Sequence, residues 1–342
     1  MLQLHPRNFV PHFTSNANAE GAKLSSFFVR PGIFDTLTQP TGHIVYGTDG
    51  NGKTAVCLML KEFFDKNKDC LVIHFDHFWC FSQNRVTLDT WLDCIQHKLL
   101  HILQQELAKS KRRMQKFRDS VKKQDFWAVC QYSRIQQDIV TEPLNPERVL
   151  EHYRTSATID KFETLSHIVK TGGFQNTYIL VDGLEDNAHF RETKDILDLI
   201  RHPLDHAGPL QRLGFTFKFF LPSVLEQPIQ LGIGIPGGLT TRKLKWEPEQ
   251  LHEMLANRLR NIPNPTRPNT RLVTVQCFAD LCVPDLGFHV DQALVQAARG
   301  SPRRLMQLAC AVIERHCQYD RQADHIRGST IAAVLEEMDH DD

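Results

Sequence analysis

The stretch Gly47-Thr48-Asp49-Gly50-Asn51-Gly52-Lys53-Thr54 decides the fold, because its glycines, lysine and hydroxyl residue follow the pattern GxxxxGK[ST]. The apolar run His43–Tyr46 precedes it, and the helical pattern Val56, Leu60, Phe63 follows it. Glycines let the backbone curl so that successive N–H groups point at a phosphate, at the positive end of the following helix. The sequence therefore predicts a strand, a phosphate-binding loop and a helix, in that order.

The residues of this loop have separate expected roles. Lys53 is expected to neutralise the β and γ phosphates of ATP, and the Thr54 hydroxyl to hold Mg²⁺. The rest of the loop and the first helical turn are expected to cradle the phosphates, at Gly47, Thr48, Asp49, Gly50, Asn51, Gly52 and Ala55. The alternative is a chance turn before a helix, which the flanking strand and helix patterns disfavour.

A phosphate-binding loop predicts a second element, an apolar strand that ends in an acid close to the metal ion. The run Tyr178–Asp182 supplies it, and Asp182 is expected to contact Mg²⁺ through water. Alone this pattern is weak, since many buried strands end in an aspartate at a turn. Together with the loop at 47–54 it predicts a site for ATP and Mg²⁺ in which Lys53 and Asp182 both take part.

The residues after Asp182 resemble the signature of STAND-class P-loop NTPases. Gly183 stands where most AAA+ enzymes have a water-activating glutamate, and acids return at Glu185 and Asp186. The resemblance implies that Glu185 or Asp186 is the catalytic base. Their order, Glu before Asp, reverses the order usual in that class and leaves the base and the hydrolysis rate open. The competing interpretation is a solvated helix start or cap.

Two further positions are similar to sensor elements of AAA+ and origin-recognition-type ATPases. The strand Phe215–Leu221 takes the place of the sensor-1 strand, with Ser223 as its polar candidate. The stretch 300–305, GSPRRL, is similar to sensor 2, where an arginine at a helix start reaches from a lid domain to the γ-phosphate; Arg303 would be that residue. The equally weighted alternative is a capped helix with Ser301 as N-cap and Arg303 exposed.

The pattern of strands and helices sets the expected fold class. The opening segment Asn8–Leu60 also looks like the start of bacterial stand-alone P-loop ATPases, and the resemblance covers most of residues 8–315. Apolar strands alternate with helices, which predicts a parallel sheet covered on both faces. The expected strands are 43–46, 70–75, 177–181, 215–221 and 239–246. We therefore expect an α/β fold with a P-loop NTPase parallel sheet flanked by helices and a C-terminal helical lid domain.

The expected domain organisation follows changes of composition along the chain. It comprises an N-terminal wrapping segment at 1–29, a P-loop NTPase core at 30–246, a helical lid at 247–335 and an acidic, frayed tail at 336–342. The core carries a helical insertion at about 92–140, where neither glycine nor proline interrupts the chain. A helix at 159–170 is expected to stop at Gly172 and Gly173.

The insertion is predicted to be one helix with an apolar seam at alternating spacings of three and four. Its positions are Leu100, Leu103, Leu107, Ser110, Met114, Phe117 and Val121. Basic residues crowd 109–123, which makes this basic helix the one local cationic patch of the sequence. It could track nucleic-acid phosphates. The favoured interpretation is a solvated helix face, because the chain is neutral and no aromatic residue interrupts the basic run before Phe117.

Composition excludes several classes of function. Lys plus Arg and Asp plus Glu each number 40 in 342 residues, so no overall attraction to nucleic acid or anionic lipid exists. Nine cysteines without a CxxC pair are typical of reduced, buried residues in a cytoplasmic protein. No signal peptide and no apolar run of membrane-spanning length are visible, so no membrane partner is expected.

Metal-ligand residue types occur in two other places. The run His74–Cys80 holds two histidines, an aspartate and a cysteine, but strand alternation sends His74 and His77 to opposite faces. Cys94, His97 and His101 share one helix face. A zinc site would need further ligands from elsewhere. Partly buried, hydrogen-bonded histidines are the favoured interpretation of both clusters.

These features predict an ATP-binding, slowly hydrolysing ATPase that acts as a nucleotide-dependent switch. The resemblance implies a homo-oligomer or a protein partner, with an arginine donated in trans from Arg201, Arg212 or Arg242. One alternative is a nucleic-acid-associated AAA+-like ATPase that uses the basic helix at 109–123. The other is an interaction module with a degenerate site that holds ATP without hydrolysing it.

Overall fold

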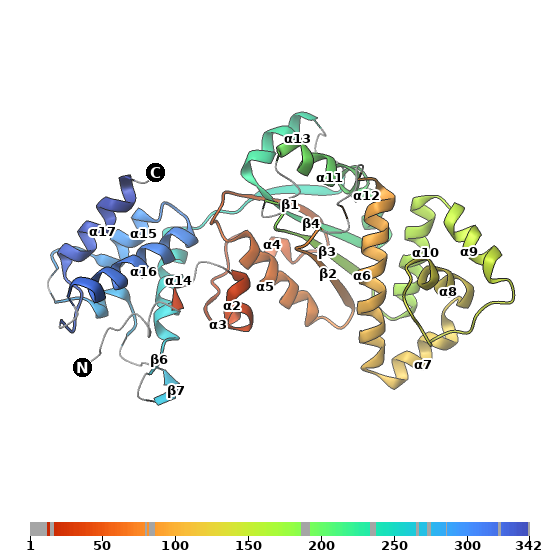
Figure 1. Ribbon diagram of the computed structural model, residues 1–342, viewed down its shortest axis with the longest axis horizontal. Coiled ribbons are helices and arrows are strands. Elements are labelled where there is room, and N and C mark those ends of the chain that lie inside the picture. Colours follow the sequence, from red (N-terminus) through yellow and green to blue (C-terminus); the bar gives the residue numbers. More distant parts are fainter. Residues whose placement is uncertain are drawn as a thin grey trace. The chain divides into compact units, whose positions relative to one another are not determined.

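The structure is a computed structural model that describes residues 12–13, 17–78, 81, 86–185, 192–232, 237–264, 267–271, 275–284, 286–320 and 323–340 (Figure 1). The chain divides into two compact units. We call residues 1–35, 47–59 and 243–342 the loop-bearing unit, and residues 36–46 and 60–242 the sheet unit. The domain boundaries expected at 29, 246 and 335 stay a prediction.

A five-stranded sheet in the order β2-β3-β4-β1-β5 forms the centre of the sheet unit. Its strands are β1 (Gly42–Gly47), β2 (Cys70–Phe75), β3 (Asn176–Val181), β4 (Phe215–Pro222) and β5 (Leu239–Lys243). β2 pairs in parallel with β3, with Ile73 opposite Ile179, and β3 pairs in parallel with β4, with Ile179 opposite Phe217. The predicted α/β fold class is confirmed. The fifth strand ends earlier than predicted, at Lys243 instead of 246.

Helices cover both faces of the sheet, which explains why its strands are nearly continuous apolar runs. On one face Trp91 of α6 packs against Phe75 of β2 with ring centroids 5.3 Å apart, and its indole N–H donates to the Leu199 carbonyl at 2.8 Å. On the opposite face Phe64 of α5 stacks on Tyr178 of β3 at 3.7 Å. Both contacts hold β2 and β3 in place, and Asp182 directly follows β3.

Except for α4, which precedes β1, the helices around the sheet fall between its strands in the sequence. They are α4 (Phe34–Leu37), α5 (Lys53–Asp65), α6 (Leu88–Ala108), α7 (Lys111–Ser120), α8 (Lys123–Tyr132), α9 (Pro146–Thr155), α10 (Thr158–Thr171), α11 (Thr193–Asp205), α12 (Ala207–Arg212), the 3-10 turn η4 (Ser223–Leu225) and α13 (Glu226–Gly232). Helix α10 ends at Gly172, and Gly173 has a φ of +85°, so the predicted stop at this glycine pair is confirmed.

The prediction of one continuous helix in the insertion is wrong. Three helices, α6, α7 and α8, replace it, and residues 133–145 are not helical. The Ser110 hydroxyl accepts the N–H of Arg113 at 3.3 Å as the N-cap of α7. A serine side chain competes for backbone N–H groups and so favours a helix start over a helix interior. The apolar seam positions Leu103, Leu107 and Phe117 are nevertheless fully buried.

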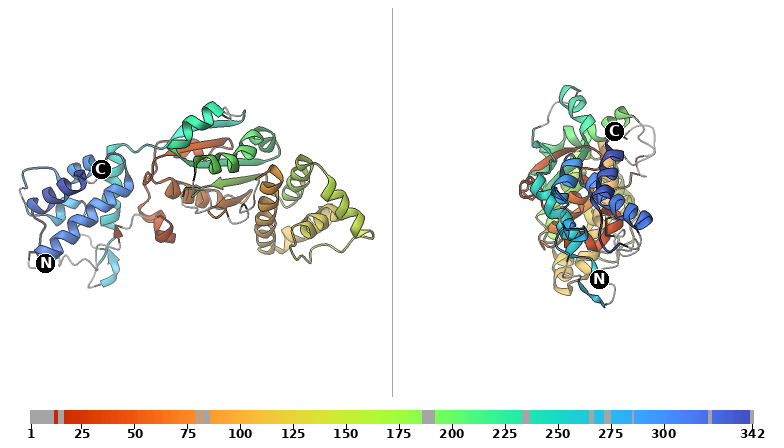
Figure 2. Two further views of the ribbon diagram at one scale, coloured as in Figure 1. Left: turned by 45° about the horizontal axis from the view of Figure 1, so that its top comes forward. Right: turned by 90° about the vertical axis from the view of Figure 1, so that its left-hand side faces the viewer.

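The loop-bearing unit is mainly helical. It contains α2 (Ala17–Glu20), the turn η2 (Gly21–Lys23), α3 (Leu24–Phe27), α14 (Pro248–Arg260), the hairpin strands β6 (Pro263–Asn264) and β7 (Arg267–Arg271), the turn η5 (Phe278–Leu281), α15 (Val290–Ala297), α16 (Pro302–Tyr319) and α17 (Gly328–His340). Helices α15, α16 and α17 pack on one another, as both views of Figure 2 show. The expected frayed tail is wrong for Glu336–His340, which form the last turns of α17.

The described N-terminal residues pack on α14 within the loop-bearing unit. The buried guanidinium of Arg258 pairs with Glu20, donates to the His12 carbonyl at 3.2 Å and lies 3.9 Å above the Phe27 ring. Asn261 just beyond the helix donates to the Ser26 carbonyl at 3.1 Å. A buried cation with a carboxylate, a carbonyl and an aromatic ring around it fixes this segment firmly in place.

Candidate phosphate-binding site

The P-loop, Gly47–Thr54, has the backbone that its glycines predict. Gly50 and Gly52 have φ values of +72° and +78°, a region that side-chain-bearing residues rarely adopt. The Asn51 N–H donates to the Thr48 carbonyl at 3.2 Å and closes the turn, and α5 begins at Lys53. Strand β1, the left-handed glycines and the helix start therefore occur in the predicted order.

Lys53 lies within the curve of its own loop. It is 5% exposed, and its Nζ donates to the carbonyl of Gly47 at 3.0 Å and to that of Thr48 at 3.2 Å. Thr54, the next residue of α5, is half-buried. The loop thus collects an ammonium, a hydroxyl and the N–H groups of a helix start, which is the donor set that suits phosphate oxygens and their metal ion. ATP with Mg²⁺ fits the residues that are present.

Asp49 places a carboxylate on this cationic loop. It accepts the N–H of Gly50 at 2.8 Å, and the Arg303 guanidinium donates to both of its oxygens at 2.7 and 2.6 Å. The Arg303 backbone N–H donates to the Gly50 carbonyl at 3.1 Å. The two side chains are 42% and 80% exposed, so the ion pair by itself adds little stability. The ion pair matters because it holds the Arg303 guanidinium against the P-loop.

The start of α16 has the helix cap that one of the two interpretations of the stretch 300–305 predicts. The Ser301 hydroxyl accepts the N–H of Arg304 at 3.2 Å as N-cap and lies 3.4 Å from the Gly50 carbonyl, while Pro302 occupies the first turn. The capped helix is therefore confirmed. The same cap also brings Arg303 to the P-loop within the loop-bearing unit. A sensor role for Arg303 stays a prediction.

Trp246, which the sequence analysis did not single out, also holds the P-loop. Its indole N–H donates to the Asn51 carbonyl at 2.8 Å, and the Asn51 side chain donates to the Leu244 carbonyl at 2.6 Å. A Cβ on Gly52 would lie 3.5 Å from the Trp246 ring. A tryptophan at the end of a predicted strand, just before a proline-led helix, is the sequence signal that could have indicated it.

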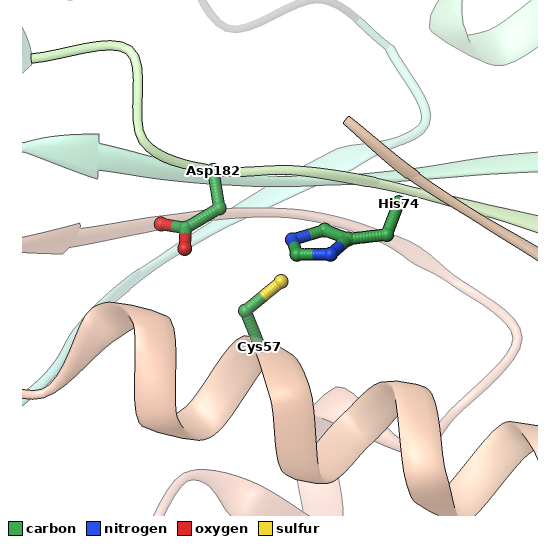
Figure 3. A group of neighbouring side chains, drawn as sticks. All are labelled: Cys57, His74 and Asp182. Carbon is green, nitrogen blue, oxygen red and sulfur yellow. The ribbon is translucent and has the colours of Figure 1, made fainter. Parts of the chain in front are cut away.

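Asp182 follows β3 in the sheet unit, as predicted. It is 2% exposed, and its N–H donates to the Phe75 carbonyl at 2.9 Å. Figure 3 shows its carboxylate beside the ring of His74 on the neighbouring strand β2. Gly183 turns the chain with a φ of +70°, and the exposed Glu185 comes two residues later. Asp186 lies outside the described residues.

The other metal-ligand residue types of the sheet unit lie on and just after β2 and on α6. The His74 side chain is 9% exposed, burial lowers its pKa, and its Nδ1 is 3.8 Å from Asp76. Cys94 is buried, whereas His97 is exposed and His101 is hydrogen-bonded to Gln105 at 2.9 Å. The described cysteines are free thiols.

The basic segment at 109–123 and the candidate trans arginines are surface features. On α7, Lys111, Arg112 and Lys116 are exposed, whereas Arg113 lies 4.8 Å above the Phe174 ring. This amphipathic arrangement favours the solvated-face interpretation. The three arginines expected to act in trans are also exposed, on α11, α12 and β5, namely Arg201, Arg212 and Arg242. Ser223 begins the turn η4. The roles of these residues stay predictions.

None of the helices in the described part of the chain combines the length and the apolarity that crossing a bilayer requires.

Comparisons with known proteins find similarity among solved structures alone. No protein-family model matches the sequence, and no curated protein matches it. Among solved structures, the chain is similar to the crystal structure of Cdc6p from Pyrobaculum aerophilum, at 12% sequence identity and a TM-score of 0.42. The similarity covers 96% of this chain and 70% of that one. A likeness this distant supports no statement about what the chain does.

Proposed function

We propose that this chain binds ATP with Mg²⁺ at the P-loop and acts as a nucleotide-dependent switch that hydrolyses ATP slowly, in the manner of STAND and AAA+-like ATPases. One observation carries the proposal: Arg303, at the start of a C-terminal helix, is held on the P-loop by Asp49 and by the Gly50 carbonyl. A cation placed there can respond to a change of charge on the bound phosphates.

The residues of the site divide the expected binding chemistry among them. N–H groups of the loop and the ammonium of Lys53 would contact phosphate oxygens. Thr54 and Asp182 would hold the metal, whose charge offsets that of the triphosphate. Because Lys53 already donates to two carbonyls, its contact with ATP would replace hydrogen bonds that the loop makes with itself.

The switch follows from competition for one guanidinium. Asp49 and a γ-phosphate are both anions that suit Arg303, and ADP lacks the γ-phosphate. A ligand shifts an equilibrium only through contacts that differ between states, so ATP and ADP should differ in their effect on Arg303. With ATP, Arg303 would leave Asp49 for the phosphate and alter the start of α16. With ADP, the pair between Arg303 and Asp49 would persist.

Hydrolysis would depend on an acid after Asp182. Glu185 is the exposed acid of that turn, and we assign it the role of general base. Glu185→Gln should slow phosphate release more than it weakens ATP binding. Turnover at the wild-type rate in this variant would remove Glu185 from the mechanism. Asp182→Ala should weaken Mg²⁺-dependent binding, because the metal loses a carboxylate.

Assembly is the proposed output of the switch, in the cytoplasm that the free thiols fit. The exposed Arg201, Arg212 and Arg242 are the candidates to complete the site of a second copy. Mass photometry without nucleotide, with ATP and with ADP, run beside a phosphate-release assay, tests this output. Tight ATP retention without phosphate release or assembly would instead support a module that only holds ATP.

Calorimetry with ATP and ADP in Mg²⁺ tests the central claim. Arg303→Ala should bring the two affinities together by removing about 1.5–3 kcal/mol from ATP binding, roughly ten- to a hundred-fold in Kd. Asp49→Asn should strengthen ATP binding, because the competing carboxylate loses its charge. Arg299→Ala, which removes an exposed arginine paired with Asp339, is the control. An unchanged ratio of ATP to ADP affinity in Arg303→Ala would contradict the switch.

A further inference from the structure

A cavity lies in the sheet unit, between the helical insertion and α9. Its volume is about 510 Å³, and its walls come from one face of α6, the end of α8 and the turn after it, and α9. Cavities of this size commonly hold small organic molecules. The face of α6 that lines it carries Cys94 and His97, part of the cluster that the sequence analysis noted and the ATP site does not use.

The charge of the cavity wall is mainly positive. Lys98, Arg134 and Arg154 line it, against the single carboxylate of Asp93. Lys98 Nζ donates to the His74 carbonyl at 2.8 Å, and Arg154 is 3.9 Å from Glu151 at its nearest. Within the described part of the chain, the Arg134 side chain makes no ion pair. Three cations around one small space favour an anionic ligand.

The backbone at Arg134 is the strongest indication that this cation has a function. Arg134 follows α8 in the left-handed region, with a φ of +54°. Its N–H donates to the Gln131 carbonyl at 3.1 Å, and the Ile135 N–H donates to the Cys130 carbonyl at 2.9 Å. This helix-ending geometry ordinarily takes glycine, because a Cβ is strained there. Backbone strain that persists at a side-chain-bearing residue points to a role for that side chain.

A comparison within the molecule sharpens this point. Arg134 and Arg299 are the non-glycine residues with positive φ in the described part of the chain. Arg299 has an evident use, because its guanidinium donates to Asp339 of α17 at 3.0 Å. Arg134 instead faces the cavity lined by Arg154 and Lys98. A ligand in the cavity would give the strained arginine at this second position its counter-charge.

A network of buried hydrogen bonds around Gln96 holds the wall of the cavity. The fully buried Gln96 donates to the Val129 carbonyl at 3.1 Å and to the Ser133 hydroxyl, and it accepts the Tyr153 hydroxyl at 2.6 Å. Tyr132, on the cavity wall, packs edge-on against Tyr153 with ring centroids 5.4 Å apart. Every polar group of Gln96 is thereby satisfied, so the wall residues Tyr132 and Ser133 are held in place before any ligand arrives.

We propose that this cavity binds a small phosphate ester of sugar-phosphate size. The phosphate would lie among Arg134, Arg154 and Lys98, since guanidinium groups match phosphate oxygens in geometry and charge. The carboxylate of Asp93 would accept a hydroxyl of the sugar. The Asp93 carboxylate is already hydrogen-bonded to the Tyr132 side chain and can accept a second donor, which suits a ligand that combines an anionic group with hydroxyls. The inference does not depend on ATP binding at the P-loop.

The test uses the full chain with Lys53→Ala, which removes the P-loop as a competing anion site. Calorimetry compares ribose 5-phosphate, glycerol 3-phosphate, inorganic phosphate and uncharged ribose. Ribose 5-phosphate should bind most tightly, inorganic phosphate about tenfold more weakly, and ribose not at all. No binding by either ester below about 10 mM would overturn the proposal. Binding of ribose as tight as that of its phosphate would overturn it equally.

Variants at the cavity separate ligand binding from folding. Arg134→Gly should raise the melting temperature by roughly 2 °C, because it relieves strain, and should weaken ribose 5-phosphate binding at least about tenfold. Arg154→Ala should weaken binding by a similar factor. Arg148→Ala removes an exposed arginine of α9 that is outside the cavity wall and should bind like the parent. Unchanged binding in Arg134→Gly would show that the strained arginine serves no ligand.

Discussion

Two buried lysines, Lys53 of the P-loop and Lys218 of β4, make similar contacts in different regions of the molecule. They are 5% and 0% exposed. The Nζ of Lys53 donates to the carbonyls of Gly47 and Thr48 at 3.0 and 3.2 Å. The Nζ of Lys218 donates to the carbonyls of Gln39 and Thr41 at 3.0 and 2.9 Å. Each ammonium thus donates to two backbone carbonyls, and Lys218 Nζ also lies 3.3 Å from the His43 Nδ1.

Their surroundings distinguish them. The carbonyls around Lys53 belong to the glycine-rich loop directly before it, whereas those around Lys218 are more than 170 residues away in sequence. Lys218 Nζ also lies beside the stacked rings of Phe64 and Tyr178, 5.7 and 5.6 Å from their centroids, and burial lowers the pKa of Lys218 to about 7. A lysine held by a local loop is suited to bind a ligand. A lysine that joins distant segments is suited to fix the fold.

The largest expected effect is the loss of ATP binding when Lys53 is removed. Lys53→Ala should cost about 3 kcal/mol of ATP binding, at least a hundred-fold in Kd, because a charge-assisted contact to the phosphates is lost. Its melting temperature should stay close to that of the wild type. Calorimetry with Mg²⁺ measures the affinity, and Lys61→Ala, on the exposed face of α5, is the control. Wild-type affinity in Lys53→Ala would mean that the P-loop does not bind ATP.

Lys218 should show the reverse pattern, in stability. Between its folded pKa of about 7 and its unfolded pKa of about 10.4, the unfolded chain binds the extra proton. The unfolding free energy should therefore rise with pH from about 7 to 10, by at most about 1.4 kcal/mol per unit, and should be lower below pH 7. Lys218→Met should flatten this rise and leave ATP affinity unchanged.

Urea unfolding at a series of pH values measures the slope. Burial lowers the pKa of His43 to about 4, so the unfolding free energy should also rise with pH between about 4 and 6.5. The slopes of the variants should therefore be compared at pH 7 and above. Lys66→Met, which removes an exposed lysine, provides the reference slope. Equal slopes in Lys218→Met and the wild type would show that Lys218 carries the same charge in the folded and unfolded chain.

The smallest expected effect concerns the loop that surrounds Lys53. A Cβ on Gly50 would lie 2.9 Å from the Arg303 Cβ at a φ of +72°, so Gly50→Ala should cost about 1–2 kcal/mol of stability. ATP affinity should fall several-fold with it. Gly32→Ala, where a Cβ meets nothing within 4 Å, is the control in thermal unfolding and calorimetry. Equal stability of the two variants would mean that the P-loop accommodates a Cβ at position 50 without strain.

Local patterns explain what the sequence could predict. The strand runs and the P-loop depend on residues close together in the chain, and they occur as expected. Ser110 misled the interpretation of the insertion, because its place in an apolar seam hid its capacity to start a helix. Lys218 stood within the run Phe215–Leu221, where one lysine among apolar residues could have indicated a buried amine. Arg134 gave no local signal, since three helices form its cavity.

The site was harder to predict than the fold for the same reason. Residues 300–305 indicated a capped helix and a phosphate sensor with equal weight, and neither interpretation included the contact between Arg303 and Asp49. That contact joins positions 254 apart in sequence. Spacing rules apply to residues that are close in sequence. The sequence could therefore indicate Arg303 as a candidate but could not identify Asp49 as its partner.

The indole of Trp246 gives the P-loop an optical reporter. Its N–H donates to the Asn51 carbonyl, and its ring lies against Gly52, so any movement of the loop backbone alters the polarity around the chromophore. Trp91 and Trp127 are buried among the helices of the sheet unit and provide a background. Trp246→Phe would identify the share of the emission that belongs to the loop. Nucleotide exchange could then be followed in real time by intrinsic fluorescence, without a label.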